Sequence, residues 1–132
     1  MKHTYNDVKS LLTSQGKFYI NLGLERIGKV LELLGNPQDK LKYFHVAGTN
    51  GKGSVCAILD AILREYGLKT GLYTSPHLFK YNERIKINGN DISDDDLAEL
   101  VFKICKIAED NQIHLTEFEI LTAVMFKYFE EN

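Results

Sequence analysis

The sequence has no tryptophan, two prolines and two cysteines among its 132 residues. Because only two prolines stand beside ten glycines, collagen-like and proline-rich low-complexity structures are excluded. The 16 basic and 18 acidic residues give a formal net charge of −2, which argues against a nucleic acid as partner. No apolar run approaches the roughly 20 residues that cross a bilayer, so no membrane partner is expected.

The two cysteines, Cys56 and Cys105, each lie inside a helical pattern of apolar residues. A disulfide would indicate an oxidising compartment, whereas two buried free thiols are typical of the cytoplasm, and the second interpretation is favoured. The first residues carry no apolar signal region, so we expect a cytoplasmic protein. Hydrophobic residues make up 44% of the chain, which excludes a disordered protein and allows a core.

Apolar residues at helical spacing predict five helices. Three of them cover residues 4–14, 24–34 and 52–66, and two more follow the capping-box patterns that begin at Ser93 and Thr116. In the helix over 52–66 the spacing predicts that five residues point inward: Val55, Ile58, Leu59, Ile62 and Leu63. In the helix after Ser93 the corresponding residues are Leu97, Leu100, Val101, Ile104 and Ala108.

Two short segments are rich in aromatic and β-branched residues and predict strands. Residues 42–47 read as a buried strand and residues 70–73 as a second one, so with the helix between them they predict a parallel βαβ unit. Residues 84–87 alternate in polarity before Asn88-Gly89, which predicts a small β-ribbon. Parallel strands belong to larger, helix-covered sheets. We therefore expect an α/β fold with parallel strands, flanking helices and an incomplete sheet, the front part of a larger protein.

The strongest chemical signal is a glycine-rich turn between the first predicted strand and the helix that follows it. Backbone amides at a helix start lack internal partners and suit phosphate oxygens, and glycines let the backbone approach an anion closely. Lys52 adds a positive charge. The turn departs from the generic phosphate-loop pattern, because Val46 stands at its first glycine position and Gly53 follows the lysine. A plain strand-to-helix turn with a solvated Lys52 is the alternative.

Motifs along the chain resemble a known family. The segment V-A-G-T-N-G-K-G-S at 46–54 is followed by Y-T-S-P-H-L at 73–78 and N-E-R-I at 82–85. Together with N-L-G-L-E-R at 21–26 and L-T-E-F-E at 115–119, they resemble the folylpolyglutamate and dihydrofolate synthases of the Mur ligase superfamily. The resemblance implies that residues 1–132 are the N-terminal portion of a P-loop ATPase-like, ATP-binding central domain. The rest of that domain and the C-terminal glutamate-binding domain would then be absent.

The resemblance also implies an activity and a set of site residues. Such ligases use ATP and Mg²⁺ to phosphorylate a carboxylate of dihydropteroate or a folate, and the amine of L-glutamate then attacks the acyl phosphate. Lys52 would be catalytic, and Ser75 would bind the magnesium. The nucleotide would lie against Gly48, Thr49, Asn50, Gly51, Lys52, Gly53 and Ser54. The pteroate pocket would be lined by Asn21, Leu22, Gly23, Thr116, Glu117, Phe118 and Glu119.

Cations at the phosphoryl oxygens make physical sense, because the carboxylate and ATP repel each other. Magnesium prefers hard oxygen ligands and few protein contacts, which suits a single hydroxyl. The resemblance further implies that the family's second magnesium ligand, a glutamate, would lie beyond residue 132, as would a later histidine and the C-terminal domain. We therefore expect the isolated chain to be inactive and, because a shortened sheet leaves open edges, to self-associate.

Each site residue also has a purely structural interpretation. Ser75 before a proline suits a strand exit, Glu119 suits the third position of a capping box, and Arg84 suits either an anion or the neighbouring Glu83. Two other functions remain open. One is a non-catalytic nucleotide-binding module. The other is a ligase of the same superfamily that acts on a cell-wall precursor, against which the Gly53-Ser54 pair and the T-S-P-H motif argue. The sequence does not distinguish dihydrofolate synthesis from polyglutamate extension.

Overall fold

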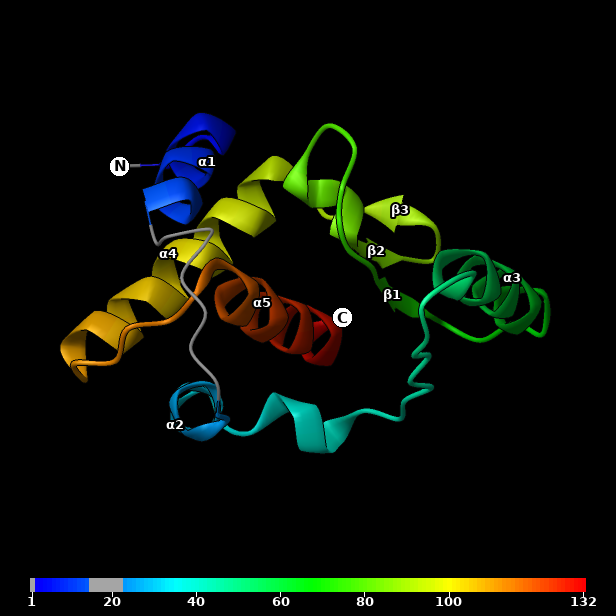
Figure 1. Ribbon diagram of the computed structural model, residues 1–132, viewed down its shortest axis with the longest axis horizontal. Helices are drawn as coiled ribbons and strands as arrows, with labels where there is room; N and C mark the ends of the chain where they lie inside the picture. The colour runs from blue at the N-terminus through cyan, green and yellow to red at the C-terminus, as the bar shows by residue number, and fades with distance from the viewer. Residues whose placement is uncertain (1, 15–22) are drawn as a thin grey trace. The chain divides into compact units, whose positions relative to one another are not determined.

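The computed structural model describes residues 2–14 and 23–132 (Figure 1). These residues form two compact units, Met1–Leu41 with Asp94–Asn132, and Lys42–Ser93. The first unit is helical, whereas the second contains one helix and the sheet. No helix in the described ranges combines the length and apolarity needed to cross a membrane.

The described part of the helical unit contains four helices and one 3₁₀ turn. Helix α4 packs against α1 and α5, and α5 packs against α2 and η1. Figure 1 shows α5, in orange and red, beside the yellow α4. The elements are α1 (Tyr5–Ser14), α2 (Glu25–Leu33), η1 (Pro37–Lys40), α4 (Asp94–Asp110) and α5 (Glu117–Glu131).

The helical predictions in this unit are confirmed, because local signals and the core agree. All five α4 residues expected to point inward are buried. Three aspartates occupy the first turn of α4, where the positive end of the helix dipole favours acids. The capping box of α5 is complete: the amide of Glu119 donates to Thr116 Oγ1 at 3.2 Å, and the amide of Thr116 donates to Glu119 Oε1 at 3.0 Å.

The second unit contains α3 (Lys52–Glu65), β1 (Gly71–Tyr73), a 3₁₀ turn η2 (Tyr81–Arg84), β2 (Ile85–Ile87) and β3 (Asn90–Asp91). The strands form one sheet in the order β1-β2-β3, and both pairings are antiparallel. Asn88 and Gly89 have φ angles of 49° and 82°, as a two-residue hairpin turn requires. The predicted ribbon is therefore confirmed.

The predicted parallel pair is corrected by the structure. Residues 42–47 form no strand and are mostly exposed, and β1 pairs with β2 in the antiparallel sense instead. The physical reason is that a parallel strand is stable only within a sheet whose edges are paired and whose faces are covered. In the unit Lys42–Ser93, β1 finds its partner in the neighbouring hairpin, and the apolar segment 42–47 has no comparable partner.

The predicted inward face of α3 is also corrected in part. Val55, Ile58 and Ile62 are exposed, with 62% of Ile58 accessible, whereas Leu59 and Leu63 are half-buried. Helix α3 packs against β1, and a strand of three residues covers only part of the face of a 14-residue helix. The helical spacing of apolar residues therefore correctly predicts an apolar face on α3, but most of this face is not buried within the unit.

Candidate functional site

The glycine-rich turn leads directly into α3. Gly48 and Gly51 have φ angles of 151° and 76°, which L side chains rarely adopt. Gly51 is the N-cap residue, and no side chain caps the helix. The first turn of α3 contains no acidic residue, whereas α2, α4 and α5 each begin with acids. The positive end of the α3 dipole is therefore not neutralised within the helix, which suits an anion.

Lys52 is the first residue of α3 and is exposed. It forms no ion pair with any residue in the described ranges 2–14 and 23–132. Its positive charge is therefore not compensated by a protein carboxylate. The other six predicted nucleotide contacts are exposed as well: Gly48, Thr49, Asn50, Gly51, Gly53 and Ser54. A loop of accessible amides, hydroxyls and one lysine can bind the oxygens of a phosphate group.

Ser75 lies two residues beyond the end of β1, in the same unit as the glycine-rich turn. The side chain is exposed, so its hydroxyl is accessible to a cation. Among the residues that the structure describes, no three His, Cys, Asp or Glu side chains gather as a metal site. A magnesium ion at this place would depend on the hydroxyl, nucleotide phosphates and water, a ligand set that magnesium accepts.

The segment after Ser75 is ordered by one carboxylate. Glu83 accepts hydrogen bonds from the backbone amides of Leu78, Phe79 and Lys80, at 2.9, 2.9 and 2.8 Å. The bonds from Leu78 and Lys80, followed by that from Phe79, hold the pKa of Glu83 below its ordinary value. Leu78 and Phe79 are each 86% exposed. Backbone contacts thus fix the shape of this loop while its apolar side chains remain at the surface.

Arg84 contacts two aromatic side chains that the sequence did not predict as its neighbours. Its Nε donates a hydrogen bond to Nδ1 of His77 at 2.8 Å, and its guanidinium lies 5.4 Å from the centre of the Tyr81 ring. The rings of His77 and Tyr81 are 4.4 Å apart. This cluster was not predicted from the sequence, although its members stand four and three positions apart.

The predicted pteroate segments lie in the helical unit. Asn21 and Leu22 are outside the described residues, and Gly23 is exposed just before α2. In the other segment, Thr116 is half-buried, and Glu117 and Glu119 are 7% and 8% exposed. Phe118 is 56% exposed, so it is the side chain of these four that is most accessible to a ligand.

An ion pair joins the first turn of α2 to the second predicted pteroate segment. Arg26 Nη2, in the first turn of α2, lies 3.1 Å from Glu119 Oε2, in the first turn of α5. The two side chains are 19% and 11% exposed. The structure therefore brings Arg26 close to Glu119, which is 93 positions later in the sequence.

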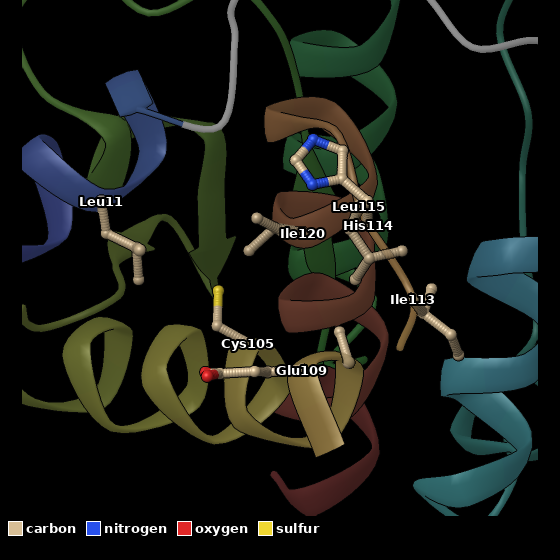
Figure 2. Close-up of a pocket in the computed structure, with 8 residues that line it drawn as sticks. Leu11, Cys105, Glu109, Ile113, His114, Leu115 and Ile120 are labelled. Atoms are coloured by element: carbon tan, nitrogen blue, oxygen red, sulfur yellow. The ribbon is translucent and has the colours of Figure 1, made fainter. Parts of the chain in front are cut away.

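A pocket of about 240 Å³ lies beside the second of these segments (Figure 2). In Figure 2 the thiol of Cys105 points into the space between Leu11 and Ile120. Burial, followed by the charge of Glu109, raises the pKa of Cys105 to about 11. No sequence pattern predicted this pocket, because its lining comes from separate elements: Leu11, Cys105, Ala108, Glu109, Ile113, His114, Leu115 and Ile120.

Comparisons with known proteins point in one direction, although no family model matches the chain. The dihydrofolate synthase/folylpolyglutamate synthase of Bacillus subtilis is 40% identical over 131 residues, which is 96% of this chain and 30% of the Bacillus protein. The bifunctional enzyme of Yersinia pestis, solved with AMPPNP and Mn, gives a TM-score of 0.88 at 37% identity, over 98% of this chain and 31% of the other.

A further solved bifunctional folylpolyglutamate synthase/dihydrofolate synthase holds Mn, AMPPNP and L-glutamate. It gives a TM-score of 0.87 at 36% identity, over 98% of this chain and 30% of the other. The chain thus spans about 30% of the length of these relatives. Over nearly all of that span, sequence and structure agree, and the chain is related to the folylpolyglutamate and dihydrofolate synthases.

Proposed function

We propose that this chain carries the nucleotide turn and part of the pteroate-binding surface of an ATP-dependent ligase. The ligase joins L-glutamate to dihydropteroate or to folates through an acyl phosphate. The observation that carries the proposal is the start of α3, where amides without a side-chain cap stand beside the exposed Lys52. The relatives solved with AMPPNP, Mn and L-glutamate support it.

The residues of the turn would act on the nucleotide in two ways. Amides from Gly51 to Gly53 would bind phosphate oxygens, as helix starts do. Lys52 would place its charge at the outer phosphates, where negative charge develops during phosphoryl transfer. Magnesium, when bound through the Ser75 hydroxyl and the phosphates, would neutralise part of this charge. The resulting acyl phosphate is reactive toward the amine of L-glutamate.

The carboxylate substrate would lie at the starts of α2 and α5. Phe118 is exposed and would offer an aromatic face to a flat pterin ring, and Thr116 and Gly23 would also belong to the proposed surface. Asn21 and Leu22 complete the proposed lining. Because the chain spans about 30% of its relatives, we also propose that it binds substrates without completing the reaction alone.

Nucleotide titration tests the proposal directly. The 132-residue chain is titrated with Mg-ATP by calorimetry, and Lys52→Ala is compared with Lys29→Ala, which removes another exposed lysine, from α2. We expect Lys52→Ala to weaken binding about tenfold or more, because a charge-assisted contact to phosphate is lost. Lys29→Ala should bind like the original chain. Equal affinity of both variants would overturn the assignment of Lys52.

A second titration distinguishes the proposed ligase from the alternative, a non-catalytic nucleotide-binding module. If Mg-ATP binds but dihydropteroate neither binds nor changes the ATP affinity, the module is favoured over the ligase. Sustained ADP release by the pure chain with dihydropteroate, L-glutamate and Mg-ATP would contradict the proposed inactivity.

The exposed apolar residues of α3 support the proposal that isolated copies of this chain self-associate. Val55, Ile58 and Ile62 form one face at helical spacing, and such a face is attractive to a second copy in water. Light scattering over a concentration series should show the apparent mass rising, and Ile58→Lys should reduce the rise. A concentration-independent monomer would contradict the proposal.

A further inference from the structure

We propose that Arg26 is a positioning residue for the pteroate substrate and acts through Glu119. The inference rests on the proposed function and adds to it a residue that touches no substrate itself. Arg26 holds the first turn of α5 in the orientation in which Phe118 presents its ring.

The geometry of Glu119 carries the argument. Each oxygen of its carboxylate has a separate partner: Oε1 accepts from the amide of Thr116 at 3.0 Å, and Oε2 accepts from Arg26 Nη2 at 3.1 Å. The amide of Glu119 in turn donates to Thr116 Oγ1 at 3.2 Å. Because two donors bind the two carboxylate oxygens of Glu119 from different directions, the plane of the carboxylate is fixed. Its hydrogen bonds with Thr116 then fix the backbone on both sides of Phe118.

The surroundings make this contact stronger than a surface ion pair. The side chains of Arg26 and Glu119 are 19% and 11% exposed, so water screens them little, and a guanidinium hydrogen bond to a carboxylate is charge-assisted. Loss of Arg26 would leave a buried carboxylate with its capping bond and without its cation. The first turn of α5 would then relax toward solvent, and the ring of Phe118 with it.

A competing interpretation is that Arg26 merely docks α5 onto the rest of the helical unit. The chain offers a second ion pair to α5 for comparison, in which Lys40 is 57% exposed and Glu130 also pairs with Lys127 at 3.5 Å. Lys40 Nζ, in η1, lies 3.0 Å from Glu130 Oε1, near the other end of α5. Both ion pairs tie the first 41 residues to α5, but only the Arg26 pair lies at the proposed substrate surface.

The experiment measures the binding of dihydropteroate to the 132-residue chain by the fluorescence of the pterin. Arg26→Gln, Arg26→Lys and Lys40→Gln are compared, together with the double variant Arg26→Gln/Glu119→Gln. Affinity for Mg-ATP, whose proposed site is in the unit Lys42–Ser93, serves as an internal control. Circular dichroism of each variant checks that the helices remain folded.

We expect Arg26→Gln to weaken dihydropteroate binding about tenfold, since close charged pairs couple by roughly that factor. Arg26→Lys, which keeps the charge, should recover most of the loss. The double variant should be no weaker than Arg26→Gln alone, because both substitutions break the same contact. Lys40→Gln should stay within about twofold of the original chain, and all four should bind Mg-ATP unchanged.

Three results would overturn the inference in distinguishable ways. Unchanged dihydropteroate affinity in Arg26→Gln overturns the role of Arg26 and leaves the proposed function standing. An equal loss in Lys40→Gln shows that general docking of α5 is responsible. If the original chain binds Mg-ATP but no dihydropteroate, the proposed substrate surface fails, and the positioning role fails with it.

Discussion

The carboxylate of Asp60, on α3, accepts a hydrogen bond from the hydroxyl of Thr70 at 2.5 Å. Its second oxygen accepts from Arg64 Nε at 3.0 Å. The backbone of Thr70 is bound in turn by Asn88, whose Oδ1 accepts from the Thr70 amide and whose own amide donates to the Thr70 carbonyl, both at 2.9 Å. A buried acid therefore connects α3 to the turn of the β2–β3 hairpin.

Replacing the hydroxyl of Thr70 should weaken this connection. Thr70→Val keeps the shape of the side chain but leaves a buried oxygen of Asp60 without its donor, which costs about 1–3 kcal/mol. We expect faster amide hydrogen exchange across β1 and β2. Thr70→Ser keeps the hydroxyl and serves as the matched control. Equal protection in Thr70→Val and Thr70→Ser would show that the hydrogen bond contributes little.

Two glycine-to-alanine substitutions should change the stability of the fold in opposite directions. Gly89 has a φ of 82°, and a Cβ there would lie 3.2 Å from Arg64 Nη1, so Gly89→Ala should destabilise the hairpin by about 1 kcal/mol or more. Gly28 lies inside α2, and no atom is within 4 Å of the position of its Cβ. Gly28→Ala should therefore stabilise the helical unit by about 0.5–1 kcal/mol.

Hydrogen exchange of the amides in each unit separates the two effects. Slower exchange in α2 for Gly28→Ala and faster exchange in β2 for Gly89→Ala are the expected results. A loss of protection in α2 on Gly28→Ala would show that the helix makes a contact there that the structure does not contain.

The sequence predicted the helical unit well because its signals are local and its core is complete. The aspartates at 94–96, the Thr116 capping box and the apolar period of α4 all favour the structure that forms. Residues 42–47 and the α3 face around Ile58 were predicted less well. Their apolar character implies burial, but burial depends on partners that are distant in sequence, and the unit Lys42–Ser93 does not supply them.

The residues of the candidate site could likewise be predicted only in part. A contiguous motif such as Gly48–Ser54 can be recognised from the sequence, because the chemistry and the turn are encoded together. The pair of Arg26 and Glu119, and the contact between His77 and Arg84, could not be predicted in this manner. Each is an interaction between residues that the fold brings together, and the first joins residues that are 93 positions apart.

Acid should loosen the loop that follows Ser75. Three backbone amides hold the pKa of Glu83 below its unfolded value, so this contribution to loop order is fully present above the unfolded pKa and is lost as the pH falls through the folded one. We expect the amide resonances of Leu78, Phe79 and Lys80 to shift together as the pH falls below about 4.3, the ordinary pKa of glutamate.

A matched variant isolates the carboxylate in this titration. Glu83→Gln retains one carbonyl acceptor but has no titrating group, so the same three amides should show no common acid transition. A transition that persists in Glu83→Gln would assign the effect to another group, and independent midpoints for the three amides would contradict a shared partner.

The thiol of Cys105 should be unusually unreactive for a half-exposed cysteine. Burial, followed by the charge of Glu109, raises its pKa to about 11, so at pH 8 only about a thousandth of the thiol is ionised, against about a quarter at an ordinary pKa of 8.5. Alkylation by iodoacetamide in a Cys56→Ser background should therefore be about a hundredfold slower than in urea. The rate should rise about tenfold per pH unit up to pH 10.

Glu109→Gln should accelerate the alkylation of Cys105 by a few-fold, because the neighbouring negative charge is removed. Mass spectrometry follows the reaction, and a folded chain that is alkylated as fast as the unfolded one would contradict the burial of this thiol in the pocket.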